Sequence, residues 1–305
     1  MFYKDDWLSW SYDGIKFGNK TTPKSEFDFQ FKKIINRPLK SHKEELLENT
    51  RVIRDSFKEP FDLLFSGGLD SEIILRCHVE LKIPINVFIF KYENDYNYHD
   101  VRHALRICDE LNVTPTVVDF NLQKFFENDA YDIWKKGYFH KAGTLPHMKM
   151  IEYLDNIPIL GLGQPDWSFE NSEWQFNLNE TDHCQSIYGV AVNRLMLDCW
   201  YEYSPEVILS HMQLPNMQHL INNAVPGDQF VFDTKKYYLY KKIWPEIAVR
   251  SKRNGFEKFG THPRVTSLEL QSLVQFQKQH IDSMDISNTV CLLSSAQLIN
   301  LLDNQ

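Results

Sequence analysis

The sequence predicts an α/β fold, in which a parallel sheet is covered by helices and joined to a helical lobe. Three short apolar runs precede or follow helical patterns at regular spacing, at residues 61–65, 85–90 and 115–120. Strands that alternate with helices in this way predict a parallel sheet with right-handed crossover connections. The first run ends in Ser66-Gly67-Gly68, and two glycines there allow a tight turn from a strand into a helix.

The composition is that of an ordinary globular protein. The 305 residues leave room for one large or two modest domains, with 43% hydrophobic and 24% charged residues. A net charge of -8 argues against non-specific nucleic-acid binding as the main task, although a local basic patch is compatible with it. The five cysteines form no Cys-x-x-Cys pair, which favours a reducing compartment, and no apolar run approaches membrane-spanning length. We therefore expect a cytoplasmic protein with no membrane partner.

The remaining elements follow from hydrophobic periodicity and from turn and capping residues. Asp13-Gly14 between two aromatic stretches predicts a hairpin, and Ser41 is a helix cap ahead of a helical apolar pattern. Residues 121–145 are irregular and charged, and form either a solvated loop or a lid over a substrate. The expected elements are a hairpin at 7–17, helices at 41–57, 70–81, 100–111 and 146–154, a fourth strand at 157–160, and helices at 186–203, 206–214, 216–224, 268–281 and 290–302.

The turn after the first strand has the features of an anion-binding loop. In Ser66-Gly67-Gly68-Leu69-Asp70-Ser71 the glycines let the backbone approach a ligand, and the helix start offers N–H groups and a positive dipole end. Ser66 and Ser71 add hydroxyl donors. Asp70 would repel a bare phosphate, so its presence indicates an intervening cation, Mg²⁺. An ordinary capped turn explains the glycines but not the whole combination.

Histidine and cysteine spacing predicts no metal centre. The eleven histidines form no His-Glu-x-x-His motif. His183 and Cys184 are adjacent, which is poor geometry for a shared metal ion, so we expect both to pack in the core or on the surface. No structural zinc is therefore predicted.

The same loop resembles a known signature. Ser66 to Ser71 is similar to the SGGxDS motif of the PP-loop, or N-type, ATP pyrophosphatases, which include asparagine synthetase, NAD synthetase and tRNA-thiolating enzymes. The resemblance implies a Rossmann-like, adenine nucleotide alpha hydrolase-like fold that uses ATP and Mg²⁺, splits ATP between the α and β phosphates and adenylates a substrate. It assigns pyrophosphate binding to Ser66, Gly67, Gly68, Leu69, Asp70 and Ser71, Mg²⁺ to Asp70, and the border of the adenine to Phe88 and Phe90.

A second stretch, Gly161-Leu162-Gly163-Gln164-Pro165-Asp166, resembles the asparagine synthetase motif Gly-Glu-Gly-Ala-Asp-Glu. The resemblance assigns Gly161 and Gly163 to pyrophosphate and Asp166 to the metal. Leu162 stands where the family has the acid that assists proton removal during amide formation, and a leucine cannot carry a proton. This departure argues against the aspartate-to-asparagine reaction itself.

A third stretch, residues 235–259, resembles the family's Leu-Pro-Glu turn and its basic run Arg-x-Lys-x-Gly-Phe. By this resemblance Lys252 faces the ATP phosphates, and Arg253 is the alternative because one extra residue precedes the glycine. A cation there offsets the charge that grows on the α-phosphate as pyrophosphate leaves, which makes Lys252 and Asp70 the expected catalytic residues. A solvated surface or an RNA-backbone patch is the other interpretation of this run.

These motifs predict the domain organisation and the function. Residues 1–39 form an N-terminal extension, residues 40–262 the PP-loop domain with a helical lobe at about 181–250, and residues 263–305 a helical tail. The expected activity is that of an ATP-dependent ligase. It adenylates a small-molecule substrate, in the first instance a carboxylate, and ammonia or an amine then attacks to form an amide.

Two alternatives stay open. One is amidation or thiolation of a nucleobase or RNA, and the other is a nucleotide-binding protein that has lost catalysis. Asparagine synthetase carries a glutaminase domain ahead of its synthetase half, and the residues before the first strand leave no room for one here. A separate ammonia source therefore stays open. The acceptor and the oligomeric state are open.

Overall fold

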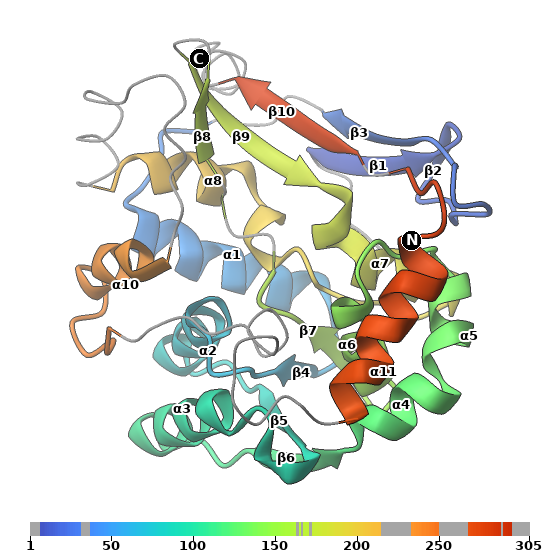
Figure 1. The fold of residues 1–305 in the computed structure, drawn as a ribbon. Helices are drawn as coiled ribbons and strands as arrows, with labels where there is room; N and C mark the ends of the chain where they lie inside the picture. Colours follow the sequence, from blue (N-terminus) through green and yellow to red (C-terminus); the bar gives the residue numbers. More distant parts are fainter. Residues whose placement is uncertain are drawn as a thin grey trace.

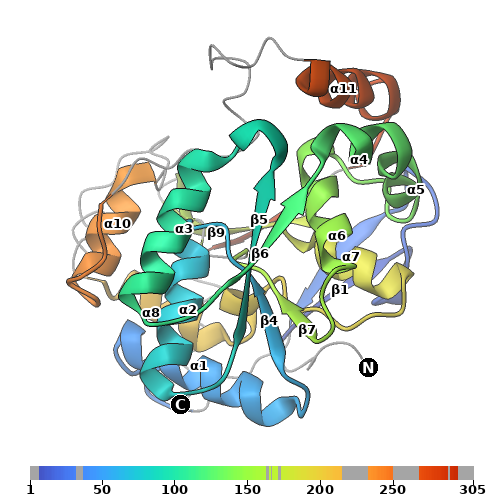
Figure 2. The same ribbon diagram turned by 90° about the horizontal axis from the view of Figure 1, so that it is seen from below.

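The structure is a computed structural model that describes residues 7–31, 37–162, 165, 167–170, 173–214, 233–249, 268–287 and 289–294. Its centre is a four-stranded parallel sheet, and two three-stranded antiparallel sheets lie above it in Figure 1. Helices cover both faces of the parallel sheet (Figure 2). The predicted α/β fold with a parallel sheet is confirmed.

The parallel sheet has the strand order β6-β5-β4-β7. Leu63 of β4 (Phe61–Leu64) is aligned with Val87 of β5 on one side and with Ile159 of β7 on the other. Because every pair is parallel, the carboxyl ends of all four strands lie at one edge, where ligands bind in open α/β sheets. The strands, all of them predicted, are β4 (Phe61–Leu64), β5 (Asn86–Tyr92), β6 (Thr116–Phe120) and β7 (Ile157–Ile159).

Two groups of helices pack on opposite faces of this sheet (Figure 2). The first group is α1 (His42–Ser56), α2 (Leu69–Leu81) and α3 (Tyr98–Glu110), and the second is α4 (Leu122–Asn128), α5 (Ala130–Lys135), α6 (Leu145–Ile151) and α7 (Cys184–Ala191). The side chains of β5 alternate to match: Val87 and Ile89 pack with the first group, and Phe90 and Tyr92 with the second. The sheet therefore separates two apolar cores.

The N-terminal residues form a small antiparallel sheet of β1 (Leu8–Tyr12), β2 (Ile15–Lys16) and β3 (Phe27–Phe31). The predicted hairpin of β1 and β2 is confirmed, while β3, which pairs with β1, was not predicted. Buried aromatic side chains of β1 and β3 belong to the same core as α4 to α7. The division of the chain into three segments stays a prediction.

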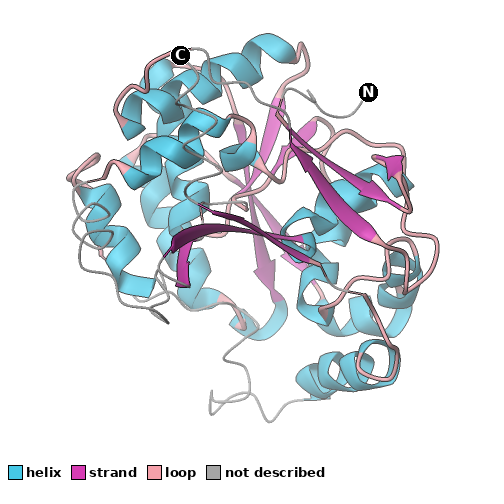
Figure 3. Ribbon diagram, turned by 90° about the horizontal axis from the view of Figure 1, so that it is seen from above, coloured by secondary structure: helices cyan, strands magenta, loops and turns pink. Residues whose placement is uncertain are grey.

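The second antiparallel sheet joins β8 (Trp167–Glu170), β9 (Glu173–Asn179) and β10 (Val290–Ser294), in the order β10-β9-β8. The predicted helix at 290–302 is wrong over residues 290–294, which pair with β9, and the rest of it lies outside the described residues. Valine and leucine suit a strand, and a partner far away in sequence decides the conformation. The Ser287 N–H donates to the Pro23 carbonyl at 2.9 Å, which ties the segment before β10 to the loop between β2 and β3. Figure 3 shows the strands of the described sheets in magenta.

Residues 121–145 are helical rather than irregular, so that prediction is wrong. They form α4, α5 and a short 3-10 turn at Ala142–Thr144. Leu122, Phe125 and Trp134 are buried in the core, and the free energy of burying these side chains outweighs the charged character of the segment.

The predicted helix at 186–203 is also wrong beyond Ala191, where α7 ends. Asn193 takes a positive φ of 54°, and the chain then runs beside β7, with Leu197 next to Ile159 and Cys199 next to Gly161. A 3-10 turn, Trp200–Glu202, follows. The apolar pattern is thus that of a buried extended segment, which periodicity alone does not separate from a helix.

The other helices are α8 (Pro205–Met212), α10 (Asp233–Lys241) and α11 (Leu268–Phe276), which is followed by a π-helical turn at Gln277–Ile281. α8 and α11 were predicted, and the helix expected at 216–224 lies outside the described residues. Among the helices that the structure describes, none has the length and apolar character needed to cross a membrane.

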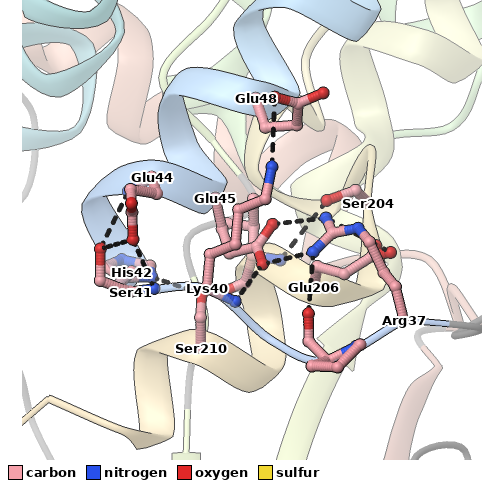
Figure 4. A network of polar contacts seen from close by, with 12 residues as sticks. Arg37, Lys40, Ser41, His42, Glu44, Glu45, Glu48, Ser204, Glu206 and Ser210 are labelled. Carbon is pink, nitrogen blue, oxygen red and sulfur yellow. Dashed lines mark hydrogen bonds and ion pairs between the residues drawn. The ribbon is translucent and has the colours of Figure 1, made fainter.

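α1 begins with a capping box, drawn in Figure 4. Ser41 Oγ accepts the Glu44 N–H at 3.4 Å, and the Ser41 N–H donates to Glu44 Oε2 at 3.0 Å. Replacing Ser41 with alanine is expected to lower the free energy of unfolding by about 1 kcal/mol, measured by urea denaturation. Ser56→Ala, at the exposed far end of α1, is the control and should cost less than about 0.5 kcal/mol. Equal losses would contradict the cap assignment.

His42, the first residue of α1, is buried between Ser210 and Tyr240. Its Nδ1 lies 2.9 Å from Ser210 Oγ and its Nε2 lies 3.2 Å from Tyr240 Oη, and burial lowers the pKa of His42 from 6.5 to about 3. As the pH falls below 6.5, the unfolded chain therefore takes up a proton that the native His42 does not bind.

The free energy of unfolding should accordingly fall by about 1.4 kcal/mol per pH unit from His42 alone. We expect His42→Gln to remove this part of the slope in urea denaturation between about pH 6 and 4. Above about pH 7.5 His42 is neutral in both states, and the slopes of the two proteins should coincide. An unchanged slope in the acid range would show that His42 is charged in the native protein.

Candidate functional site

The loop between β4 and α2 lies at the carboxyl edge of the parallel sheet. Gly67 has a positive φ of 74°, a conformation that side chains other than glycine rarely adopt. A Cβ on Gly67 would lie 2.6 Å from the Asp100 carbonyl oxygen and 2.7 Å from the Ala104 nitrogen. The first glycine is therefore required both by the turn and by the close packing of the loop against α3.

Two hydroxyl groups flank the start of α2. Ser66 Oγ lies 3.3 Å from Ser71 Oγ and accepts the Gly68 N–H at 3.2 Å, and Ser71 Oγ donates to the Gly68 carbonyl at 3.2 Å. Gly68 is the N-terminal cap residue, with no side chain to occupy the helix end. The first N–H groups of a helix have no acceptor within the helix, and with the dipole they favour an anion. The hydroxyls and this helix end thus form a small cradle of donors.

Asp70 lies in the first turn of α2, next to this cradle. The residue is half-buried, and its carbonyl oxygen accepts a hydrogen bond from Tyr201 Oη at 2.8 Å. Leu69, by contrast, is 4% exposed and belongs to the core with α1 to α3, so only its backbone is available to a ligand. Carboxylate and hydroxyl oxygens are ligands that suit Mg²⁺, so the chemistry of Asp70 with Ser66 and Ser71 fits that ion.

Gly161 brings the end of β7 onto the cradle. A Cβ on Gly161 would lie 2.6 Å from the Ser71 nitrogen and 3.0 Å from the Asp70 carbonyl carbon. The strand order reverses between β4 and β7, because β5 and β6 extend the sheet on the other side of β4. Such a reversal is the switch point at which open α/β sheets bind ligands. The structure thus brings Gly161, the first residue of the second predicted loop, onto the first loop.

Phe88 and Phe90 lie on β5, next to β4. The Phe88 carbonyl accepts the Phe65 N–H at 2.8 Å, which ties the start of the loop to β5. Phe88 is half-buried, whereas Phe90 is 7% exposed and packs against Phe120 with ring centroids 6.2 Å apart. A hollow of about 430 Å³ opens at the ends of β5 and β6, and neither Phe88 nor Phe90 lines it. The border of an adenine at these residues stays a prediction.

Four predicted site residues, Gly163, Asp166, Lys252 and Arg253, lie outside the described residues. The chain leading to Lys252 is nevertheless fixed to α2. Trp244 Nε1 donates to Glu80 Oε2 at 2.9 Å, and Arg76 Nη1 donates to Glu246 Oε1 at 3.1 Å. α2 is therefore the common support of the cradle and of the chain that precedes the basic run.

The structure also places three residues near the cradle that the sequence did not indicate together. His183 Nδ1 lies 2.8 Å from Cys199 Sγ, and His183 Nε2 lies 3.2 Å from Glu202 Oε2. Of the two expected locations, core or surface, His183 takes the core, since it is 2% exposed, and its ring contacts Cys199 rather than the adjacent Cys184. Only the turn at Asn193, which reverses the chain after α7, brings the two side chains together.

Acidic groups control the charge of these residues. Burial disfavours a charged imidazole, but the carboxylates of Glu202, Asp198 and Asp182 outweigh it, so the pKa of His183 is raised. Burial, together with Asp198 and Glu202, raises the pKa of the Cys199 thiol well above its usual range. Burial and the carboxylates therefore favour the neutral thiol of Cys199 and make the His183 imidazole a stronger proton acceptor than a free histidine.

The sequence matches no family model and no curated protein. Among solved structures, it is similar to an NH3-dependent NAD synthetase from Campylobacter jejuni in complex with the nitrate ion, with 14% identity and a TM-score of 0.33 over 78% of this chain and 95% of that one. An NMN synthetase from Francisella tularensis is similar with 12% identity and a TM-score of 0.32, over 81% of this chain and 96% of that one.

Proposed function

We propose that this protein is an ATP-dependent ligase that adenylates a substrate carboxylate, releases pyrophosphate and forms an amide. The observation that supports it most directly is the cradle of Ser66, Ser71 and the start of α2 at the switch point of the sheet, with Asp70 beside it. Donors arranged at a helix start suit a phosphate chain, and a carboxylate beside them suits a metal ion bound to that chain.

Each described group has a defined part in this proposal. Ser66, Ser71 and the N–H groups at the start of α2 bind pyrophosphate oxygens. Gly67 lets this loop pack against α3, and Gly161 lets the end of β7 pack against the start of α2. Asp70 holds Mg²⁺, which supplies the positive charge that offsets the leaving pyrophosphate. Lys252, with Arg253 as the alternative, and Asp166 complete the site in the proposal by their resemblance to the family's basic and metal-binding positions.

Leu162 concerns the amide-forming step of the proposed reaction. It is half-buried and packs against the core that contains α4 to α7. A leucine here cannot take a proton from an attacking amine, so that proton must go to another group or to solvent. We propose a small-molecule substrate, with ammonia supplied by a separate source or an amine as the acceptor.

ATP–pyrophosphate exchange tests the proposal. Purified protein is incubated with Mg²⁺, ATP and labelled pyrophosphate across a panel of amino acids, small carboxylates and nucleotides, with Asp70→Asn as the blank. Exchange that depends on one panel member identifies the substrate class, and dependence on a nucleotide would favour base modification instead. ATP binding with no exchange across the panel would favour a binding protein without catalysis, and no ATP binding would overturn the proposal.

A further inference from the structure

His183 lies between a thiol and a carboxylate. Its Nδ1 is 2.8 Å from Cys199 Sγ and its Nε2 is 3.2 Å from Glu202 Oε2, so the two ring nitrogens have different partners. Cys199 is partly exposed, while His183 and Glu202 are buried, at 2% and 5% exposure. A thiol, an imidazole and a carboxylate in this order form the arrangement in which a histidine removes a proton from a nucleophile and a carboxylate orients the histidine.

The arrangement lies beside the proposed nucleotide site. Cys199 pairs with Gly161 through the backbone, and Gly161 packs onto Ser71 and Asp70 at the start of α2. Two residues after Cys199, Tyr201 Oη donates to the Asp70 carbonyl at 2.8 Å. The segment that carries the thiol is therefore in direct contact with the loop that would hold the phosphates.

A metal ion shared by the three residues is the alternative use of the cluster, since their side-chain ligand atoms lie within 4.8 Å of one another. One ion can bind only one of the two nitrogens of His183. A tetrahedral ion would also keep a nitrogen and a sulfur ligand about 3.5 Å apart, given bond lengths of about 2.0 and 2.3 Å. The 2.8 Å contact between Nδ1 and Sγ is shorter than that, and it suits a shared proton instead.

We propose that Cys199 is an acyl-accepting nucleophile, with His183 as its base and Glu202 as a positioning residue. The inference rests on the proposed function for the origin of the acyl group. The thiolate attacks the acyl carbon of the adenylate, a C–S bond forms, the bond between that carbon and the phosphate oxygen breaks, and AMP leaves with the electron pair. The thiol, which donates to Asp198 Oδ1 at 3.2 Å in the resting protein, passes its proton to Nδ1 of His183 at 2.8 Å during the attack. An amine or ammonia then attacks the thioester, and the thiol is restored as the amide leaves.

The acidic surroundings explain how such a thiol stays unreactive without substrate. The groups that face His183 are Asp182, Asp198, Glu202 and Cys199 itself, together with the ring of Phe29 at 5.1 Å between centroids. Burial and the three carboxylates near the sulfur disfavour a free thiolate. Transfer of the proton to His183 during the attack removes the need for a thiolate in the resting protein.

The thiol step can be tested without ATP. p-Nitrophenyl acetate supplies an activated acyl group, and attack on it releases p-nitrophenolate and leaves an acetyl group on sulfur. We expect a burst of p-nitrophenolate and acetylation of Cys199 located by peptide mass spectrometry, both lost in Cys199→Ala. Cys291→Ala is the matched control, since Cys291 is also partly exposed, and it should keep the full burst. A burst that survives in Cys199→Ala would overturn the proposal.

The positioning role of Glu202 is tested by a measurement that a purely structural role would not change. Removal of its carboxylate lowers the pKa of His183, so Glu202→Gln should shift the pH profile of the burst to lower pH, and Glu202→Asp should restore the native profile. Equal loss of the burst at every pH in both variants would overturn the positioning role. Stoichiometric zinc in the purified protein that disappears in Cys199→Ala would show that the cluster is a metal site instead.

Adenylation and acyl transfer are separated by a second assay. ATP–pyrophosphate exchange needs no thiol, so Cys199→Ala should retain exchange within about twofold of the native protein and lose amide formation by at least about 100-fold. Amide formation unaffected in Cys199→Ala would overturn the thiol step alone. Absence of exchange in the native protein would overturn the proposed function, whatever the result with p-nitrophenyl acetate.

Discussion

Asp70→Asn is expected to lower ATP–pyrophosphate exchange by about 100-fold or more while the protein stays folded. Asparagine has nearly the same shape as aspartate but no charge, and the hydrogen bond that Tyr201 Oη donates at 2.8 Å goes to the Asp70 backbone carbonyl, which the substitution keeps. The fold should therefore survive, whereas a metal ion loses the charge that holds it. The measurement is the exchange rate as a function of Mg²⁺ concentration, together with thermal unfolding.

The matched control for this prediction is Asp95→Asn. Asp95 is an exposed carboxylate beyond the end of β5, paired with Lys91 at 2.9 Å, so it lies at the same edge of the sheet but not in the cradle. It should retain exchange within about twofold. If both variants lose activity equally, the negative charge of this sheet edge as a whole matters, rather than Asp70 as a ligand of the metal ion. If Asp70→Asn keeps full exchange, Asp70 does not bind the metal.

Gly67→Ala is expected to lower the free energy of unfolding by about 2–4 kcal/mol and to abolish ATP binding. Two costs add: the left-handed conformation at a φ of 74°, worth about 1 kcal/mol for a residue with a Cβ, and the collision of that Cβ with backbone atoms of α3 at 2.6 and 2.7 Å. Since backbone atoms cannot move aside as a flexible side chain does, the loop itself must shift. Urea denaturation and calorimetric titration with Mg-ATP measure the two effects.

Gly14 provides the control for this substitution. It has nearly the same φ, 76°, but a Cβ there would meet no atom within 4 Å. Gly14→Ala should therefore show the conformational cost alone, about 1 kcal/mol, with ATP binding intact. The difference between the two variants is the steric contribution of the loop against α3. A similar loss of unfolding free energy in both variants would mean that α3 shifts to make room for the Cβ. The loop would then be less constrained than its contacts indicate.

The parallel sheet and its loop could be predicted because their signals are local. A buried strand, a glycine turn and an amphipathic helix each depend on neighbours within one short stretch, as in Phe61–Leu64 with α2. The pairing of β10 with β9 depends on residues far apart in the sequence, so Val290–Ser294 carried no sign of its partner and was mistaken for a helix. The helix predicted beyond Ala191 is wrong for a similar reason, because an apolar pattern fits both a buried helix and a buried extended chain.

The candidate site likewise contains residues that a local motif identifies and residues that only the fold brings together. Ser66, Gly67 and Ser71 are neighbours in sequence and in space, and one motif identifies them. Cys199 meets His183 only because the chain turns at Asn193 and returns beside β7. No spacing rule covers such a contact, since the turn is set by packing against the sheet rather than by the residues that it brings together.

β10 is synthesised after the other two strands of its sheet, so this sheet is completed late when the chain folds during translation. β9 is the central strand of the sheet β10-β9-β8, and His183 follows it directly along the chain. A nascent polypeptide that has not yet reached Val290 leaves one edge of β9 without its partner, and an open strand edge invites pairing with other chains. Cotranslational folding can thus complete the parallel sheet early, but the layer next to His183 closes only after Val290–Ser294 have been synthesised.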